Sequence, residues 1–313
     1  MTEKYNDRSN RPDVAAGGVK MIPITTPLGI FNVWTKRIGN NPALKVLLLH
    51  GGPGGTHDAF EVFDSFLPAA GVEYYYYDQL GSGRSDIPTD SSLWDLNRFI
   101  DEVEQVRIAL DLGPSNFVLL GHSWGGILAM EYSLKHGGQL KGLVVSNMMS
   151  SVPAYNRYAT DILMPAMNQD DLAEIQEIEA AEDFANPRYM ELLVRSYYVD
   201  HILRINPVPE PVRYSFAHLN HDVYLLMQGP SELGIHREAI LADWDRTSDL
   251  EHIAVPTLVL GGRHDTMDPT FLEMMATRIP RGSSYICENG SHFAMYDDQD
   301  AYFSALLSFL SRL

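Results

Sequence analysis

A serine between glycines is the first feature of the sequence that could carry out covalent chemistry. Ser123 is the centre of Gly121-His122-Ser123-Trp124-Gly125. The apolar residues 117–120 before it predict a strand, and residues 124–136 after it predict a helix. A serine at such a sharp turn has a strained backbone and an exposed hydroxyl, and the flanking glycines prevent collisions across the turn. The five-residue pattern is common by chance, but its place between a strand and a helix predicts that Ser123 is a nucleophile.

A serine hydroxyl needs a base to take its proton, and the base needs an acid to orient it. The chain has 11 histidines, so position must select among them. His292 lies between a predicted strand at 284–287 and the closing helix, and Asp265 follows a predicted strand at 257–261. This order of serine, acid and histidine is the one expected after a nucleophile turn of this type. We therefore predict a catalytic triad of Ser123, Asp265 and His292.

Two other carboxylates compete with Asp265 for the role of the acid. Asp268 precedes Pro269, which is the pattern of a residue that caps the next helix. Glu288 precedes Asn289-Gly290 and is predicted to be a loop carboxylate. Both are therefore weaker candidates than Asp265.

The anion that forms when a serine attacks a carbonyl needs N–H donors that are already in place. One predicted donor is the backbone N–H of Trp124, directly after the nucleophile. The other is expected from the glycine-rich segment His50-Gly51-Gly52-Pro53-Gly54-Gly55, with Gly52 as the first choice. A phosphate-binding loop is the rival interpretation, but the segment has no lysine and lacks the G-x-x-x-x-G-K-[ST] pattern.

Strands and helices alternate at both ends of the chain, which positions these residues. Residues 19–37 predict a β-hairpin around Pro27-Leu28-Gly29, and short apolar runs predict strands that are buried on both faces. The further predicted strands are 45–49, 72–77, 117–120, 140–146, 257–261 and 284–287, and the predicted helices are 97–112, 124–136, 269–278 and 298–313. This alternation predicts an α/β fold with a mostly parallel sheet and helices on both faces.

The middle of the chain, residues 147–248, differs because it has helical patterns at 170–181 and 188–205 and no strong strand signal. We expect this segment to be a helical cap, or lid, over the carboxyl edge of the sheet, where ligands bind in open α/β sheets. A separate binding domain is the alternative. With residues 147–248 as the cap, residues 19–146 and 249–313 form the predicted core domain, and residues 1–18 form a predicted flexible tail.

Composition narrows the class of protein. The net charge is −18, from 41 acidic and 23 basic residues, which argues against nucleic acid as a partner. The same charge either attracts cationic substrates or simply keeps the surface soluble. The single cysteine, Cys287, excludes an intramolecular disulfide and most zinc sites. The polar N-terminus and the lack of a long apolar run predict a cytoplasmic, soluble enzyme without a membrane partner. No metal or organic cofactor is implied, and the sequence indicates no oligomeric state.

Several of these blocks together resemble one family, the proline iminopeptidases (prolyl aminopeptidases) of the α/β-hydrolase fold. The resemblance covers residues 20–313, including a lid of the right size and place. The blocks are His50-Gly51-Gly52-Pro53-Gly54-Gly55, Asp78-Gln79-Leu80-Gly81-Ser82-Gly83-Arg84-Ser85, Gly121-His122-Ser123-Trp124-Gly125-Gly126, Gly262-Arg263-His264-Asp265 and Gly290-Ser291-His292. The first two are more specific than the serine pattern alone, which lipases, esterases and haloalkane dehalogenases share.

The resemblance implies that a carboxylate of the lid holds the free amino group of the substrate. The matching stretch, Met227 to Leu233, places this role on Glu232, where a carboxylate and an ammonium would form a charge-assisted hydrogen bond. An exposed lid glutamate is the alternative. Some relatives carry a second glutamate directly after the triad aspartate, but this chain has Thr266 there. The amine site would then carry less charge or use another acid such as Glu210.

The resulting hypothesis is a serine hydrolase that releases an N-terminal residue, preferably proline, from short peptides with a free amine through an acyl-enzyme. An amino-acid amide hydrolase of the prolinamide type is the nearest alternative, and an esterase or lactonase is a further one. Ser123 argues against an epoxide hydrolase, because those enzymes normally have an aspartate nucleophile. A non-catalytic receptor on the same fold is disfavoured because every part of the triad and of the oxyanion loop is present.

Overall fold

The computed structural model describes residues 7–313, and an 8-stranded sheet in the order β1-β2-β4-β3-β5-β6-β7-β8 forms its centre. β1 and β2 form the predicted hairpin, and β2 pairs antiparallel with β4, whereas the strands from β4 to β8 run parallel to their neighbours. The strands are β1 (Val19–Thr26), β2 (Gly29–Ile38), β3 (Lys45–Leu49), β4 (Glu73–Asp78), β5 (Phe117–His122), β6 (Gly142–Ser146), β7 (Thr257–Gly262) and β8 (Gly282–Cys287). The prediction of a mostly parallel sheet is confirmed.

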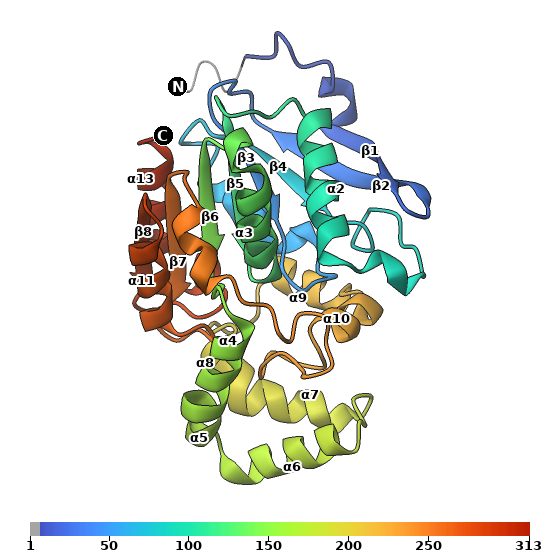
Figure 1. Ribbon diagram of the computed structural model, residues 1–313, viewed down its shortest axis with the longest axis vertical. Coiled ribbons are helices and arrows are strands. Elements are labelled where there is room, and N and C mark those ends of the chain that lie inside the picture. Colours follow the sequence, from blue (N-terminus) through green and yellow to red (C-terminus); the bar gives the residue numbers. More distant parts are fainter. Residues whose placement is uncertain (1–6) are drawn as a thin grey trace.

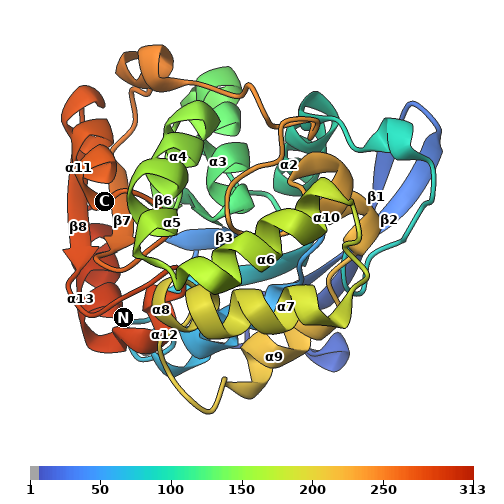
Figure 2. The same ribbon diagram turned by 90° about the horizontal axis from the view of Figure 1, so that it is seen from below.

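Helices cover both faces of this sheet because successive side chains of a strand point to opposite faces. In β3, Leu47 and Leu49 belong to one apolar core and Val46 and Leu48 to the other. Figure 2 shows the sheet between these two helical layers. The first layer is α2 (Leu96–Ala109), α3 (Trp124–His136) and α11 (Pro269–Arg278), and the second is η2 (His57–Ser65), α12 (Ala294–Asp297) and α13 (Gln299–Leu310).

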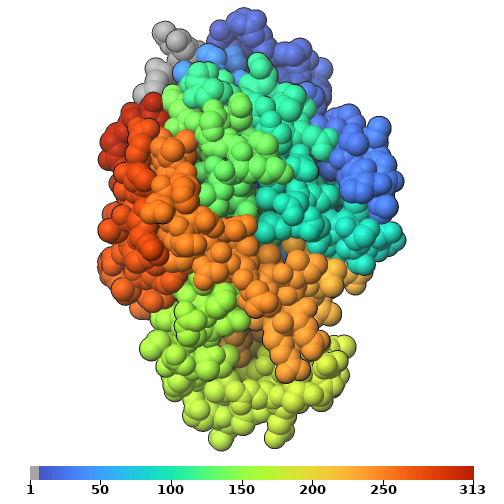
Figure 3. All heavy atoms as spheres, in the orientation of Figure 1, coloured from blue at the N-terminus to red at the C-terminus, as the bar shows by residue number. Residues whose placement is uncertain are grey.

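The segment between β6 and β7 is helical and lies below the carboxyl ends of the parallel strands (Figure 1), where it forms a separate lobe in the space-filling view (Figure 3). We propose residues 147–248 as a cap domain on a core of residues 19–146 and 249–313. The helices of the segment are α4 (Val152–Tyr158), η5 (Ala159–Leu163), α5 (Met164–Ala166), α6 (Gln169–Ala180), α7 (Pro187–Leu193), η6 (Val194–Tyr198), α8 (Val199–His201), α9 (Glu210–Ala217) and α10 (His221–Met227).

The C-terminal end of the chain lies at the side of the sheet opposite this lobe (Figure 1). Residues 1–6 lie outside the described residues, so the expected flexible tail over residues 1–18 falls partly outside them. Within the rest of that segment, Asp13 pairs with Arg37 of β2 at 2.5 Å. None of the helices formed by residues 7–313 is long and apolar enough to cross a membrane.

Candidate active site

Ser123 stands at the turn between β5 and α3, with φ 56° and ψ −127°. Positive φ is uncommon for a residue other than glycine and stores backbone strain. Hydrogen bonds hold the turn, because the Ser123 N–H donates to Ser146 O at 3.0 Å and the Gly126 N–H donates to Ser123 O at 2.7 Å. A Cβ at Gly121 would lie only 1.9 Å from Gly125 O. The glycines are therefore required for the turn, as the sequence predicted.

His292 and Asp265 meet in the loops after β8 and β7. His292 Nδ1 lies 2.8 Å from Asp265 Oδ1, and both side chains are buried. An ionised carboxylate can only accept, so Nδ1 carries the proton and Nε2 is free to act as a base. Ser123 and His292 line the same cavity. The structure thus brings the predicted serine, acid and histidine together.

The charge environment of His292 favours its protonated form. Burial alone would lower the pKa of His292, but the charge of Asp265 and its hydrogen bond outweigh burial and raise the pKa above its ordinary value. Glu232 and Asp297 act in the same direction. The imidazolium that would form during serine attack is therefore stabilised.

The two competing carboxylates have other partners. Asp268 caps α11 by accepting the N–H of Thr270 at 2.9 Å, as predicted. Glu288 forms a surface ion pair with Arg263 at 2.8 Å, as expected of a loop carboxylate. Neither residue replaces Asp265 beside His292.

The sequence analysis did not predict that Asn147 contacts the acid. The Asn147 side-chain amide donates to Asp265 Oδ2 at 2.7 Å and to Ser291 O at 3.1 Å, which ties the acid loop to the histidine loop. Asn147 is fully buried, has φ 53° and directly follows β6. A polar residue at the carboxyl end of a buried parallel strand was the available signal.

The glycine-rich loop after β3 lies against the serine. A Cβ at Gly51 would lie 3.0 Å from Ser123 Cβ, and Gly52 lines the cavity with φ 110°. Trp124 is the first residue of α3, so its backbone N–H is among those at the helix N-terminus that no intrahelical carbonyl satisfies. The two predicted oxyanion donors, Gly52 and Trp124, therefore lie on the segments that flank Ser123.

The cavity has a volume of about 460 Å³ and is bounded by both the core and the cap. Its cap wall is largely apolar, with Ser215, His221 and Glu232 as its polar residues. The apolar and aromatic residues of this wall are Met190, Val194, Tyr198, Val199, Ile202, Leu203, Val208, Phe216, Leu219, Tyr224 and Pro230. Glu232 lines the same cavity as Ser123 and His292. Glu210 does not line it, because its side chain forms an exposed pair with Arg213. The structure therefore places Glu232, and not Glu210, in the cavity of Ser123 and His292.

Tyrosines of the cap hold Glu232 in place. Tyr224 Oη donates to Glu232 Oε1 at 2.6 Å, Tyr155 Oη donates to Glu232 O at 2.7 Å, and Tyr198 Oη accepts the Glu232 N–H at 3.2 Å. Burial raises the pKa of Glu232 and Asp265 adds to this, whereas His292 and Tyr224 oppose it. A cationic partner would therefore be favoured beside this carboxylate.

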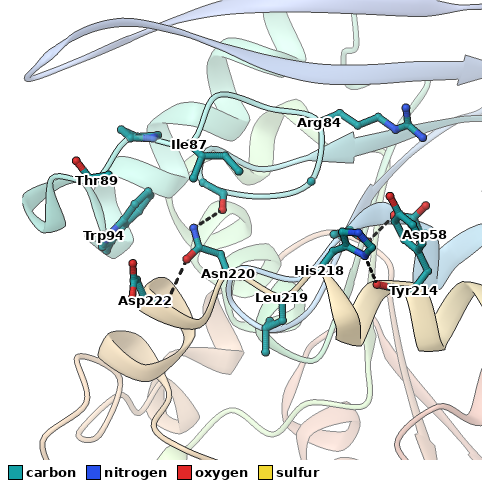
Figure 4. A pocket seen from close by; sticks show the side chains of 14 residues that line it. Asp58, Arg84, Ile87, Thr89, Trp94, Tyr214, His218, Leu219, Asn220 and Asp222 are labelled. Atoms are coloured by element: carbon teal, nitrogen blue, oxygen red, sulfur yellow. Dashed lines mark hydrogen bonds between the residues drawn. The ribbon is translucent and has the colours of Figure 1, made fainter. Parts of the chain in front are cut away.

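A second crevice of about 400 Å³ lies between the loop after β4 and the helices α9 and α10 (Figure 4). Asn220 bridges it, because its side-chain amide donates to Gly81 O at 2.8 Å and its backbone N–H donates to Gly54 O at 2.8 Å. The cap also contacts the loop after β8 that carries His292, where the backbone N–H of His292 donates to His201 O at 2.9 Å. The cap is therefore bonded directly to the loops that form the site.

Within residues 7–313, no group of three or more His, Cys, Asp or Glu side chains is arranged to hold a metal ion.

Comparison with known proteins identifies related sequences and structures. The model of the alpha/beta hydrolase fold matches residues 45–299. A proline iminopeptidase of Elizabethkingia meningoseptica is 53% identical over 290 residues, which cover 93% of this chain and 97% of the relative. A proline iminopeptidase of Flavobacterium johnsoniae is 50% identical over 291 residues, which cover 93% of this chain and 97% of the relative. The crystal structure of a proline iminopeptidase of Mycobacterium smegmatis superimposes with a TM-score of 0.82 at 26% identity and covers 94% of this chain and 98% of that one.

Proposed function

The chain belongs to the proline iminopeptidase family of the α/β-hydrolase fold, and from this we propose that it releases N-terminal proline from short peptides through an acyl-enzyme on Ser123. The observation that carries the proposal is the shared cavity of Ser123, His292 and Glu232. It combines a nucleophile and its base with a carboxylate for the free amine. This combination suits an enzyme that removes one residue from the amino end of its substrate.

The reaction proceeds in two halves. His292 Nε2 takes the proton of Ser123 Oγ as this oxygen attacks the carbonyl carbon of the first residue. The backbone N–H groups of Gly52 and Trp124 stabilise the oxyanion. His292 then gives its proton to the leaving nitrogen as the C–N bond breaks, which leaves the prolyl ester on Ser123. Water, deprotonated by His292, attacks this ester, and proline is released as Oγ regains its proton.

Glu232 sets where the peptide is cut. Its carboxylate lies in the cavity, and Tyr224 occupies Oε1, so Oε2 is available to the prolinium N–H groups. A charge-assisted hydrogen bond of this kind contributes about 1.5–3 kcal/mol. A substrate without a free amine would bury this carboxylate without a cationic partner, which is costly. The enzyme is therefore an exopeptidase.

The substrate class that we propose is a short peptide with a free amino terminus, processed in the cytoplasm. Amino-acid amides such as prolinamide present the same carbonyl and amine to the site and differ only in their leaving group.

The experiment that tests this function compares p-nitroanilides of proline, alanine and leucine, each with a free and with an acetylated amine. We expect kcat/KM to be highest for the free proline compound and to fall by about 10- to 100-fold on acetylation, because the contact with Glu232 is lost. Glu232→Gln should remove most of this discrimination. Equal rates on free and acetylated compounds would refute the aminopeptidase proposal.

A further inference from the structure

The side chain of Gln79 joins the two segments that carry the proposed oxyanion donors. Gln79 directly follows β4 and is 1% exposed. Its Nε2 donates to His50 O at 3.2 Å, and its Oε1 accepts the indole N–H of Trp124 at 2.9 Å. One carboxamide therefore connects the glycine-rich loop after β3 with the start of α3.

The imidazole of His50 is held in a single tautomer by the same contacts. Its Nδ1 lies 2.9 Å from Gly51 O, and a carbonyl oxygen can only accept, so Nδ1 carries the proton. Its Nε2 accepts the backbone N–H of Gln79 at 3.1 Å. Burial lowers the pKa of His50, with Asp78 opposing this, so the neutral ring that these two bonds require is favoured.

These bonds fix the direction of the Gly52 N–H. Gly51 O and Gly52 N belong to the same peptide group, which is planar, so holding the oxygen also orients the N–H at its other end. Gly51 O accepts from His50 Nδ1 and also from the Gly55 N–H at 3.3 Å. The chain of contacts from Gln79 through His50 thus ends at the first oxyanion donor.

The second donor has little freedom to move independently. A Cβ at Gly125 would lie 2.1 Å from Leu49 O and 2.9 Å from His50 O, so the first turn of α3 packs directly on the end of β3. The indole of Trp124 is buried and contacts Phe99 edge to face at 5.3 Å. Its bond to Gln79 sets the rotation of this ring and, through it, the position of the Trp124 backbone.

We propose that Gln79 is a positioning residue of the oxyanion hole, which sets the spacing and direction of the Gly52 and Trp124 N–H groups. This inference rests on the proposed acyl-enzyme function. Gln79 does not line the cavity of Ser123, so it acts through the two donors and not on the substrate. Oxyanion donors bind the transition state much more strongly than the substrate. Displacing them therefore lowers kcat and leaves KM nearly unchanged.

The experiment uses Gln79→Glu and Gln79→Leu in the full chain. Gln79→Glu keeps the acceptor for Trp124 and loses the donor to His50 O, whereas Gln79→Leu loses both. Loss of one oxyanion donor costs about 10²–10³ in kcat, so its displacement should cost about 10- to 100-fold on proline p-nitroanilide. KM should change by less than about threefold.

A second readout separates positioning from general loosening of the site. Pyrrolidine-2-boronic acid forms a tetrahedral adduct with a serine and places a boronate oxygen in the oxyanion hole, whereas prolinol occupies the amine site without such an adduct. The inhibition constant of the boronic acid should rise by the same factor by which kcat falls, and that of prolinol should stay unchanged. Asn116→Asp is the matched control. It also replaces a carboxamide with a carboxylate and loses a side-chain hydrogen bond to a backbone carbonyl, from Asn116 Nδ2 to Pro42 O at 3.2 Å, but far from the site.

Any other result contradicts either the positioning role of Gln79 or the proposed function. Unchanged kcat in folded Gln79 variants, or equal weakening of prolinol and the boronic acid, overturns the positioning role. If neither variant folds, Trp124→Phe decides instead, because it removes the indole N–H that Gln79 Oε1 accepts and keeps an aromatic ring beside Phe99. An unchanged kcat there also overturns the role. If the unmodified enzyme does not hydrolyse proline p-nitroanilide, the proposed function fails, and not this inference.

Discussion

His292 and Glu232 face one cavity with opposite requirements for protons. In the proposed reaction, His292 must be neutral to take a proton from Ser123, and Glu232 must be ionised to hold an ammonium. Glu232 is among the groups that raise the pKa of His292, and His292 in turn opposes the rise in the pKa of Glu232. A bound substrate ammonium would stabilise the ionised form of Glu232, so this carboxylate would no longer depend on a positive charge on His292. The two side chains therefore couple substrate binding to the protonation of the base.

This coupling predicts the pH dependence of kcat/KM. The pKa of His292 is raised, so activity should rise with pH through a value above about 6.5, the ordinary pKa of histidine. Activity should fall again as the substrate ammonium loses its proton, near about pH 8 for an α-amino group. Glu232→Gln removes a negative charge near His292, so the acidic limb should move to lower pH. Rates measured from pH 5 to 10 check this, and an acidic limb below 6.5 or an upward shift in the variant would contradict it.

Single residues differ in how far the sequence could predict them. Ser123, Asp265 and His292 are recognisable because each follows a predicted strand in the expected order. Asn147 and Gln79 also follow buried strands, but their partners lie in the loops after other strands and at the start of α3. The order of the strands in the sheet, β4-β3-β5-β6-β7-β8, decides those contacts, and the sequence pattern does not contain that order.

The turn from β5 to α3 depends on close contact between backbones. A Cβ at Gly125 would meet the carbonyl oxygens at the end of β3, which cannot rotate away as a side chain would. Gly125→Ala should therefore lower the stability of the fold by about 1–3 kcal/mol or more, and it should also displace Trp124. Thermal unfolding measures the first effect, and kcat on proline p-nitroanilide measures the second.

Gly113→Ala is the control for this substitution, because a Cβ at Gly113 meets no atom within 4 Å and the residue does not have positive φ. Gly125→Ala with the melting temperature and kcat of the unmodified enzyme would show that the turn tolerates a side chain, contrary to this account.

Long helices were predictable and short ones were not. The predicted helix at 269–278 coincides with α11, but the predicted helix at 188–205 is interrupted by the π-helical turn Val194–Tyr198 and ends at His201. The sequence analysis assigned no helix to α4, α9 or α10, which have only one to two turns. Ser151 and Asn220, which cap α4 and α10, were the available signals. Helices of this length are stabilised mainly by tertiary packing, which local sequence does not specify.

The complete site is assembled from distant parts of the chain. The proposed nucleophile comes from the first half of the chain, and the proposed acid and histidine come from roughly the last fifty residues. The carboxylate proposed to bind the amine comes from the segment between them. The His201 carbonyl accepts the backbone N–H of His292, and the backbone N–H of Asn220 donates to Gly54 O. These bonds seat the segment on the loop that carries His292 and on the glycine-rich loop. The resemblance could suggest Glu232, but only the three-dimensional structure shows that it shares a cavity with Ser123. The same structure excludes Glu210 from that cavity.

The most direct test of the whole account is the release of free proline from an unblocked Pro-Gly-Gly tripeptide by the unmodified enzyme and by Ser123→Ala. Circular dichroism and thermal unfolding should show that the variant is folded. The account predicts repeated turnover by the unmodified enzyme and a loss of at least about 10⁴-fold in the variant, because the remaining groups cannot form an acyl-enzyme. A folded Ser123→Ala variant that releases proline within tenfold of the original rate would contradict it.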